Sequence, residues 1–424
     1  MEVREASASY TGMSEPPKDT ASFGFIQTEA GLIPEDWVVL SLGQILLKKQ
    51  LGGNYKNSEI ETQWPLIKMG NLGRGRIKLD KIEFVDTSQS PADRDRLELD
   101  DVLFNTRNTL ELVGKVALWR NELPEAYFNS NIMRMEFEAS LISSNRFMNY
   151  FLNTPHSISA LRAMATGTTS VAAIYSRDFV NLTVAIPSKS EQQAIAEALS
   201  DADALIESLQ QLIAKKRQIK QGTMQALLTD KQRLPGFGEE WEEKQLGDVL
   251  TFQVGYPFSS KFFNEKEQGL RLVKNRDLKS DDQIFHYSGQ YDSSFQVGDG
   301  DVLIGMDGDF LPCRWNKGGA LLNQRVGRIV PRNSLDRAFA FYYLIEPLKE
   351  IEAATSSTTV KHLSHGDVEG ITKPLPTLAE QTAIATILTD MDTELAELET
   401  RLVKTRQLKQ GMMQELLTGR IRLL

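Results

Sequence analysis

The chain has few of the residues on which covalent or metal stabilisation depends. It contains one cysteine, Cys313, in 424 residues, which excludes a disulfide framework and a cysteine-rich zinc site. Its four histidines leave little scope for a histidine-ligated metal; they are His156, His286, His362 and His365. The nearest approach to a calcium loop, Asp307-Gly308-Asp309, lacks the other ligand positions. We therefore predict no metal site in this chain.

Long apolar runs and an excess of positive charge are also lacking. No apolar run approaches the ~20 residues that cross a bilayer, and residues 1–23 are polar, without the apolar core of a signal peptide. These features predict a cytoplasmic protein with no membrane partner and a disordered tail over residues 1–23. The net charge of −9 excludes a uniformly basic nucleic-acid binder, so any DNA-facing surface must be local.

Motifs that would indicate catalysis are missing as well. The run Met69-Gly70-Asn71-Leu72-Gly73 lacks the Gly-Lys-Ser/Thr of a phosphate-binding loop. There is no Asp/Asn-Pro-Pro-Tyr run, which amino-methyltransferases use to hold their target base. No convergent acid/base or cofactor-binding set is visible. We expect no catalytic residue and no cofactor in this chain, so it is predicted not to be an enzyme by itself.

What the chain does contain is an internal duplication. Residues 186–234 align without a gap on residues 375–423, and 23 of the 49 positions are identical. The copies begin IPSKSEQQAIAEAL and LPTLAEQTAIATIL, and they end KQGTMQALLTDKQRL and KQGMMQELLTGRIRL. Chance does not produce such an alignment. A duplicated chain can fold as a pseudo-dimer, and a pseudo-dimer can read a two-part target.

Each copy predicts a long helix. Apolar residues recur at alternating steps of four and three, which is typical of a coiled-coil seam. Each helix is expected to start just after Pro187 or Pro376, and ~39 residues would span roughly 58 Å. The residues predicted to pair the helices are Ile195, Leu199, Ile206, Leu209 and Ile213 in the first copy and Ile384, Leu388, Met391, Leu395, Leu398 and Leu402 in the second.

The order of charges favours antiparallel pairing of the two helices. Copy one carries five acids and no base from Glu191 to Glu207, and then four bases and no acid up to Lys220. Copy two repeats this order from Glu380 to Lys409. An antiparallel pair places each acidic half beside a basic half, whereas a parallel pair places like charges together. The alternative is that acids early and bases late simply match the helix dipoles.

Two globular segments, residues 24–185 and 235–374, precede helical residues 186–234 and 375–424. The two segments are weakly similar in sequence. Trp37 and Trp241 are each followed by Leu-Gly at the same spacing, and Asp101-Val102-Leu103 matches Asp301-Val302-Leu303. Short β-rich and helical runs alternate within both segments. The predicted fold is α+β, with two globular α/β domains joined by two long antiparallel coiled-coil helices in a pseudo-two-fold arrangement.

Local basic stretches provide candidate DNA contacts. Between Lys48 and Lys81 there are eight bases and three acids, and a weaker excess runs from Tyr256 to Lys279. Lys and Arg suit phosphates, and Arg, Asn and Gln suit base edges; the alternative is a solvated basic face. Hydroxyl-rich loops near Thr168 and Thr358 suit phosphates or are simple turns, and Arg107 could instead pair with Glu111. The candidates are Lys48, Lys49, Tyr55, Lys56, Asn57, Lys68, Asn71, Arg74, Arg76, Lys78, Arg107, Asn108, Thr168, Thr169, Tyr256, Lys261, Lys274, Asn275, Arg276, Thr358, Thr359, Lys361 and His362.

The helix tails contain a glycine within the run Lys-Gln-Gly-x-Met-Gln. Glycine inside a helix costs ~1 kcal/mol relative to alanine, and its occurrence in both copies suggests close approach of another backbone; a simple helix break is the alternative. Neighbouring apolar residues would pack on a partner protein or on the opposite domain. The predicted docking residues are Gly222, Met224, Leu227, Leu228, Gly411, Met413, Leu416 and Leu417.

The order domain, helix, domain, helix, with the opening GLIPEDW and the duplicated junctions and helix tails, resembles the specificity subunit of type I restriction–modification systems. The loops DVLFNTRNTLELVGKVALW and DVLIGMDGDF also look like versions found in that family. The resemblance extends from about Gly31 to Leu424. It implies a non-catalytic DNA reader whose two target-recognition domains each read half of a split asymmetric duplex site.

The resemblance also implies partners. The helices would set the spacer and dock two methyltransferase subunits, which bind S-adenosylmethionine, and two restriction subunits that use ATP and magnesium would join them. The alternative function from another class is a coiled-coil adaptor whose globular ends bind proteins rather than DNA. The negative net charge favours that alternative slightly.

Overall fold

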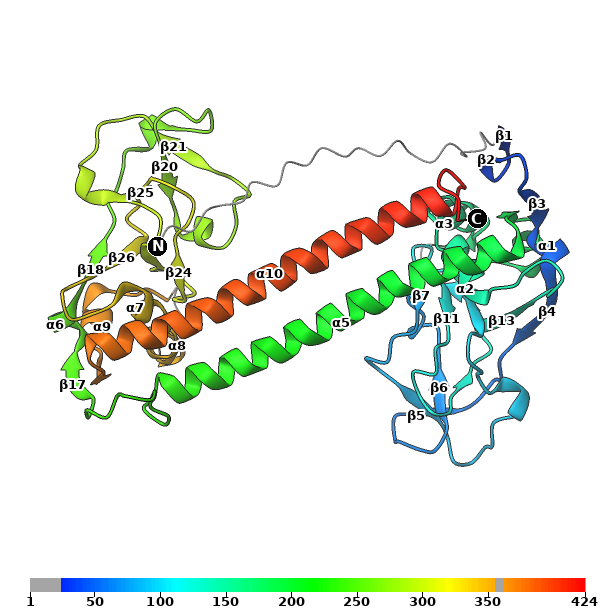
Figure 1. The fold of residues 1–424 in the computed structure, drawn as a ribbon, viewed down its shortest axis with the longest axis horizontal. Helices are drawn as coiled ribbons and strands as arrows, with labels where there is room; N and C mark the ends of the chain where they lie inside the picture. The colour runs from blue at the N-terminus through cyan, green and yellow to red at the C-terminus, as the bar shows by residue number, and fades with distance from the viewer. Residues whose placement is uncertain (1–23, 169, 355–360, 424) are drawn as a thin grey trace, which may run out of the picture. The chain divides into compact units, whose positions relative to one another are not determined.

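The computed structural model describes residues 24–168, 170–354 and 361–423 and divides into two compact units (Figure 1). Unit 1 comprises the chain up to Glu207 together with Val403–Leu424, and unit 2 comprises Ser208–Leu402. Each unit therefore combines one globular domain, the start of the long helix that follows it, and the end of the other long helix.

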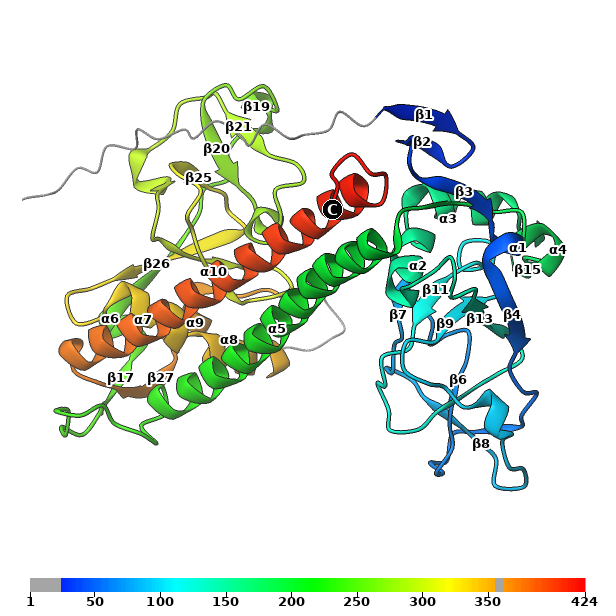
Figure 2. The ribbon, with the colours of Figure 1, turned by 45° about the vertical axis from the view of Figure 1, so that its right-hand side comes forward.

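Domain 1 is built on two larger sheets. The first has the order β4 (Leu46–Leu51), β13 (Ile132–Phe137), β9 (Val102–Asn105), β11 (Val116–Leu118) and β7 (Gly75–Arg76), and the second has the order β12 (Tyr127–Phe128), β6 (Pro65–Ile67), β8 (Glu83–Val85) and β5 (Asn57–Ser58). Helix α2 (Asn145–Leu152) packs on β11 and β9, and α3 (Pro155–Ala163) packs on α2 (Figure 2). The remaining elements are β1 (Phe25–Thr28), β2 (Gly31–Pro34), β3 (Val38–Ser41), α1 (Leu42–Ile45), a 3-10 turn (Asp93–Asp95), β10 (Arg107–Asn108), β14 (Thr166–Gly167), β15 (Ala172–Ala173), α4 (Ser176–Phe179) and β16 (Thr183–Ile186).

Domain 2 repeats this plan with different lengths. Its first larger sheet has the order β18 (Leu250–Val254), β26 (Val326–Pro331), β23 (Val302–Gly305) and β24 (Pro312–Arg314). Its second larger sheet has the order β19 (Phe263–Asn264), β21 (Phe285–Tyr287), β20 (Leu270–Val273), β25 (Ala320–Leu322) and β22 (Gln296–Val297). The remaining elements are β17 (Glu242–Gln245), α6 (Leu246–Val249), α7 (Arg337–Tyr343), α8 (Ile345–Ala354), α9 (His365–Glu369), β27 (Thr372–Leu375) and 3-10 turns at Ser260–Phe262, Asn275–Leu278 and Ser293–Phe295. The predicted α+β class is confirmed.

The two duplicated segments form helices α5 (Lys189–Leu227) and α10 (Leu378–Leu416), each of 39 residues. In unit 2, Lys216 Nζ lies 2.6 Å from Glu394 Oε1, and Lys220 pairs with Asp392. The residue number rises along α5 while that of its partner falls along α10, so the helices run antiparallel there. In unit 1, Lys409 Nζ lies 2.6 Å from Asp203 Oδ1. The predicted antiparallel pairing of acidic and basic halves is confirmed.

The duplicated pairs Glu191-Gln192 and Glu380-Gln381 connect each long helix to its domain through hydrogen bonds. Glu191 is buried at the start of α5 and accepts hydrogen bonds from Trp37 Nε1 (3.2 Å) and from Arg422 Nε and Nη2 (2.6 and 2.9 Å). Glu380 repeats this with Trp241 Nε1 (3.2 Å) and Arg233 (2.8 and 2.7 Å). Each carboxylate therefore joins a domain, its own helix and the segment that follows the other helix.

The glutamine that follows is equally buried. Gln192 Oε1 accepts from Ser143 N at 2.9 Å, and its Nε2 donates to Leu141 O at 2.9 Å. Gln381 repeats this pattern, accepting from Asp336 N at 2.8 Å and donating to Ser334 O at 3.0 Å. The motif thus supplies hydrogen-bond partners to backbone groups at the turn before α2 or α7.

A second duplicated contact sets the register of the helices. Tyr150 on α2 donates to Asp203 Oδ2 at 2.7 Å, and Lys409 from α10 lies on the same carboxylate and over the Tyr150 ring. Tyr342 and Asp392 repeat the arrangement with Lys220. Burial raises the pKa of the Tyr150 hydroxyl to about 12, so this group donates at neutral pH.

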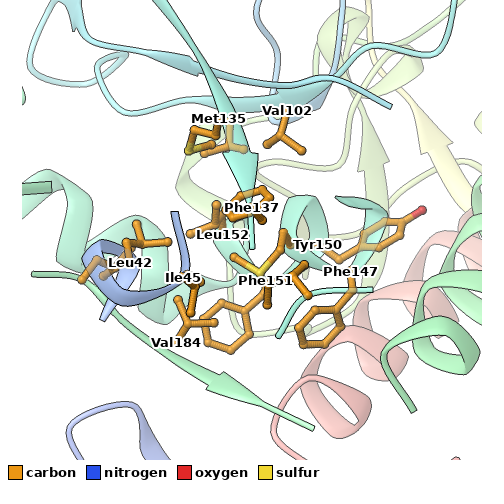
Figure 3. Packing of buried hydrophobic residues seen from close by; sticks show 14 of the residues in the cluster. Leu42, Ile45, Val102, Met135, Phe137, Phe147, Tyr150, Phe151, Leu152 and Val184 are labelled. Carbon is orange, nitrogen blue, oxygen red and sulfur yellow. The ribbon is translucent and has the colours of Figure 1, made fainter. Parts of the chain in front are cut away.

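The domain cores extend into the helices. In domain 1, side chains from α1, β9, β13, α2 and β16 interdigitate (Figure 3), and Ile195 and Leu199 of α5 join the same cluster. Leu416 and Leu417 at the end of α10 are buried in it as well. In unit 2, Ile384 and Leu388 take the corresponding places, with Leu227 buried beside them and Met224 and Leu228 packed against the cluster. Because burial of apolar area stabilises association, the end of each helix is an integral part of the other repeat's unit.

This packing decides between the two alternatives for the apolar docking residues. Leu227, Leu416 and Leu417 are buried against a globular domain of the same chain, so for them the structure shows packing on the opposite domain. Gly222 and Gly411 differ, because a Cβ added at either would meet no atom within 4 Å. None of the helices in the described ranges is long and apolar enough to cross a bilayer.

Candidate nucleic-acid interface

Two of the predicted residues of domain 1 meet at the ends of β9 and β4. Lys49 and Arg107 line a crevice of about 540 Å³. Its floor contains Phe104 and Phe179, whose ring centroids are 4.4 Å apart. Lys49 Nζ donates to Ser176 Oγ at 3.1 Å. The crevice therefore combines an apolar floor with two cations, a combination that suits a polyanion carrying apolar groups.

A small sheet of order β10-β15-β14 brings two predicted loops together. Arg107 pairs with Ala173, and Ala173 pairs with Thr166, so the Arg107–Asn108 strand and the threonine-rich turn are neighbours. Thr168 N donates to Val171 O at 2.9 Å, and Thr168 Oγ1 accepts from Val171 N at 3.2 Å, which makes the turn a closed hairpin. Thr169 lies outside the described residues. The suggested Arg107–Glu111 pair is not present in the described part of the chain.

Several other predicted residues of domain 1 are engaged within the domain. Tyr55 donates to Asp95 Oδ2 at 2.5 Å, and burial raises the pKa of its hydroxyl. Lys56 pairs with Asp86 at 3.3 Å, and Lys68 pairs with Glu83 at 2.9 Å. Asn57 bonds to the same Glu83. These pairs are on or near the surface and are weak, so the lysines remain able to exchange their partners for phosphates.

Asn71 has a different role from the predicted one. Its side chain is buried, accepts from Lys68 N at 2.9 Å, and donates to Lys78 O and Lys81 O at 3.0 and 2.8 Å. The amide holds a loop together and does not face solvent. In contrast Lys48, Arg76 and Lys78 are exposed, and Asn108 is half-buried with its Oδ1 accepting from Thr109 N at 2.8 Å.

In domain 2 the residues Lys274, Asn275 and Arg276 line a cavity of about 500 Å³. Lys274 Nζ lies 3.3 Å from the centroid of the Phe285 ring, and burial lowers the pKa of its ammonium group. Arg276 Nη2 donates to Gln283 Oε1 at 2.9 Å. Asn275 Nδ2 donates to Asp307 O at 2.7 Å. The guanidinium group of Arg276 is therefore held in place with further N–H groups left to donate.

Two predicted residues far away in the sequence contact Asp307 and Gly308 at the edge of this cavity. His362 Nδ1 lies 2.9 Å from Asp307 Oδ1, and Arg325 Nη1 lies 3.2 Å from the same oxygen. Lys361 O accepts from Gly308 N at 3.0 Å, while Lys361 Nζ donates to Glu352 O at 2.6 Å. Thr358 and Thr359 lie outside the described residues. Tyr256 and Lys261 are exposed. The Tyr256 ring packs edge-on against Phe258 and tilted against Phe295, with centroid distances of 5.2 Å in both pairs.

Comparison with known proteins agrees with this architecture. Residues 34–217 and 238–405 each match the family described as the type I restriction modification DNA specificity domain. The chain belongs to this family. A putative type I restriction enzyme specificity subunit from Methanocaldococcus jannaschii, MjaX, is 27% identical over 418 residues, which cover 94% of this chain and 96% of the relative. The EcoBI specificity subunit of Escherichia coli is 35% identical over 188 residues, which cover 43% of this chain and 40% of the relative.

Solved structures share the fold. The crystal structure of the type I restriction–modification S subunit from M. genitalium superposes with a TM-score of 0.60 at 16% identity and covers 90% of this chain and 96% of that one. A chain from a study of complex assembly and conformational transition of the type I R-M system has a TM-score of 0.52 at 19% identity, covering 92% and 99%. At these identities the likeness concerns the fold alone.

The two recognition domains of this specificity subunit present different side chains on one framework. Ile174 N donates to Thr106 O at 3.0 Å, and Leu363 N donates to Met306 O at 2.8 Å in the corresponding place. Asn129 forms an isolated parallel β-bridge with Gly53, and Asn323 forms the corresponding bridge with Tyr256. Three pairs of equivalent positions follow from these contacts and differ in residue type: Arg107 and Asp307, Ala173 and His362, and Asn131 and Arg325.

Several residues that line these sites are not among those predicted from the sequence. They are Ser130, Asn131, Tyr175 and Ser176 in domain 1 and Gln283, Phe285, Asn323 and Arg325 in domain 2. A signal exists for some of them: the polar triplets Asn-Ser-Asn and Asn-Gln-Arg directly follow the buried strands β12 and β25. Polar triplets after short buried strands at equivalent places in a duplicated chain indicate a displayed loop.

Proposed function

We propose that this chain reads a split, asymmetric sequence in duplex DNA, with each recognition domain reading one half. The observation that carries the proposal is the pair of equivalent loops that share a framework and differ in Arg107 and Asp307 and in Asn131 and Arg325. Arg and Asn differ in the base edges they recognise. Two equivalent domains with unlike side chains would therefore read two unlike half-sites.

The cavity of domain 2 and the crevice of domain 1 both present side chains that suit base edges or phosphates. Arg276 and Arg325 are each held by a neighbouring acceptor, which reduces the entropy lost on binding. Lys49 and Arg107 flank apolar side chains at the crevice. Among the described residues, no group of three or more His, Cys, Asp or Glu side chains is placed to hold a metal ion. In this proposal the chain recognises DNA, and the chemistry belongs to its partners.

The partners we infer are two methyltransferase subunits that carry S-adenosylmethionine and two restriction subunits that use ATP and magnesium. The family membership and the relatives that are specificity subunits of type I restriction enzymes support this assignment. The 39-residue helices would set the distance between half-sites. Domains reading successive major grooves on one face would leave an uncontacted gap of ~5–8 base pairs.

The test is DNA binding and methylation by the complex assembled with its methyltransferase. Filter binding against duplex DNA should show salt-dependent affinity, and sequencing of methylated genomic DNA should show two short unlike half-sites separated by a gap. Removal of one heptad from each helix, residues 208–214 and 398–404, shortens each by roughly 10 Å and should abolish modification of the original site. A continuous target, or no DNA binding by the assembled complex, would favour the adaptor function.

Substitution of Gly222 tests partner docking. Since a Cβ at Gly222 meets nothing within the chain, Gly222→Ala should leave the isolated subunit as stable or up to ~1 kcal/mol more stable. Gly222→Leu should reduce assembly with the methyltransferase, as measured by gel filtration. The matched change Gln221→Leu on the same turn is the control. Full assembly with Gly222→Leu would show that the glycine is not a docking site.

A further inference from the structure

Four basic side chains from three segments of domain 1 gather beside β7. Arg74 and Lys78 flank the β7 hairpin, which is closed by Gly73 N donating to Arg76 O at 2.9 Å. A Cβ added at Gly73 would lie 3.4 Å from Lys78 Cε, so the Lys78 side chain folds back over the residue next to Arg74. Strand β11 lies parallel beside β7 (Figure 2), with Ala117 opposite Gly75. That register places Lys115, two residues earlier, next to the hairpin.

The end of α3 contributes the fourth base. A Cβ added at Gly114 would lie 3.4 Å from Leu161 Cβ, so α3 packs directly against the residue before Lys115. Arg162 follows Leu161, and its Nη2 donates to Glu111 O at 3.5 Å. The helix therefore brings a guanidinium group to the turn that leads into β11, which the spacing along the sequence does not indicate.

These cations face one another without an acidic partner. No ion pair within the described ranges involves any of the four, although acids outnumber bases 57 to 48 in the chain. Burial and then the nearby Arg162 lower the pKa of Arg74, and burial and then Lys78 and Arg74 lower the pKa of Lys115. Arg74 Nη1 is buried without a hydrogen-bond partner. Asn153 Oδ1 is also unpartnered, but a neutral amide does not balance this charge.

We propose that Arg74, Lys78, Lys115 and Arg162 form a binding site for a phosphate group of the DNA backbone. The inference rests on the proposed function and adds Lys115 and Arg162 to it. A phosphate brings a full negative charge and several acceptor oxygens, which a guanidinium fork and ammonium groups bind through charge-assisted hydrogen bonds. Such a contact would fix the register of domain 1 on the duplex and carry no sequence information.

Phosphate fits the site better than a carboxylate from a partner protein. Four cations converge on one place. A backbone phosphate presents four oxygens arranged as a tetrahedron, two of them anionic, whereas one carboxylate presents two oxygens in a single plane. A free phosphate ion presents the same kind of anionic oxygen as the DNA phosphodiester, so the experiment separates the two sources. An acidic surface on the methyltransferase is the other possible occupant and would show itself in assembly.

The test uses Lys115→Met, which keeps the aliphatic stem, and Arg162→Gln, separately and combined. In the complex with methyltransferase, each single change should weaken DNA binding roughly tenfold, equally for the methylated target sequence and for unrelated duplex. Each should reduce the slope of log K against log salt by about 1. Lys349→Gln, which removes an exposed lysine paired with Glu346 on α8, should change neither. Removing a repelled cation should leave the unfolding temperature of the full chain unchanged or raised.

A second measurement does not depend on DNA. Inorganic phosphate should raise the unfolding temperature of the full chain more than chloride at equal ionic strength, and the double variant should lose that difference. If the wild-type complex fails to bind DNA, the proposed function fails, and this measurement still decides whether the site takes phosphate. Unchanged affinity and salt slope with intact wild-type binding would overturn the proposal. Loss of phosphate stabilisation alone would assign the site to free phosphate, and loss of assembly alone would assign it to the methyltransferase.

Discussion

Replacing Arg422 with methionine should destabilise unit 1 by about 3–5 kcal/mol, because it leaves a buried carboxylate without its charged partner. Glu191 is fully buried, and Arg422 binds it through two hydrogen bonds across 231 residues of sequence. Arg422 also binds both oxygens of Asp36 at 2.9 and 2.7 Å. A substitution after the second long helix would thus loosen the domain that precedes the first one.

Hydrogen exchange is the measurement, since it reports on each domain separately. Protection should fall in domain 1 with Arg422→Met and in domain 2 with Arg233→Met, which removes the equivalent partner of Glu380. Arg420→Met is the control, because Arg420 is largely exposed and pairs with Glu415, and its effect should stay within about 0.5 kcal/mol. Adding Glu191→Gln to Arg422→Met should recover stability, since the amide oxygen still accepts from Trp37. Unchanged protection of domain 1 would contradict the role of Arg422.

The same contact predicts a pH dependence. Hydrogen bonding with Arg422 lowers the pKa of the Asp36 carboxyl below its ordinary value. A lowered pKa in the folded state contributes stability that is present above the unfolded pKa of ~4 and is lost as the pH falls through the folded pKa. Arg422→Met should remove this part of the acid dependence, so the difference in stability between variant and wild type should shrink below about pH 4.

A fragment of residues 234–424 should form a two-fold dimer that directs methylation to a palindrome. In the full chain domain 2 is completed by Arg233 on Glu380, Lys220 on Asp392 and Leu227 in its core. The fragment lacks these three residues but carries Arg422, Lys409 and Leu416 at the positions 189 residues later. A second copy would therefore supply the same three contacts in the same antiparallel register, and a two-fold dimer presents one surface twice.

Light scattering should give a dimer, and with methyltransferase present the modified site should contain two copies of one half-site with a similar gap. Lys409→Glu in the fragment should prevent dimerisation, because it places like charges together at Asp392. The matched change Lys404→Glu, at an exposed position outside that contact, should have less effect. A well-folded monomer, or modification of the original asymmetric site, would show that the two halves are not equivalent in this way.

The sequence by itself determined the duplication, the two long helices and their antiparallel orientation. The seam of apolar residues and the separation of acids from bases are properties of neighbouring residues on one helix, so they can be read along the chain. Helix bounds of Lys189–Leu227 and Leu378–Leu416 follow closely from the duplicated segment. The family could also be recognised, because its junction and helix-tail motifs occur twice.

Only the tertiary structure decided which segments complete each domain and which polar side chains are free. Arg422 lies over the Trp37 ring, and His362 is hydrogen-bonded to Asp307. The sequence does not reveal such contacts between distant segments, because they depend on how strands and helices are brought together. From the sequence, Asn71 is predicted to contact DNA, whereas in the structure its buried amide is hydrogen-bonded to the backbone of its own loop. An amide or a cation has the same chemistry in every sequence, and its neighbours in space decide whether it holds the fold together or faces a ligand.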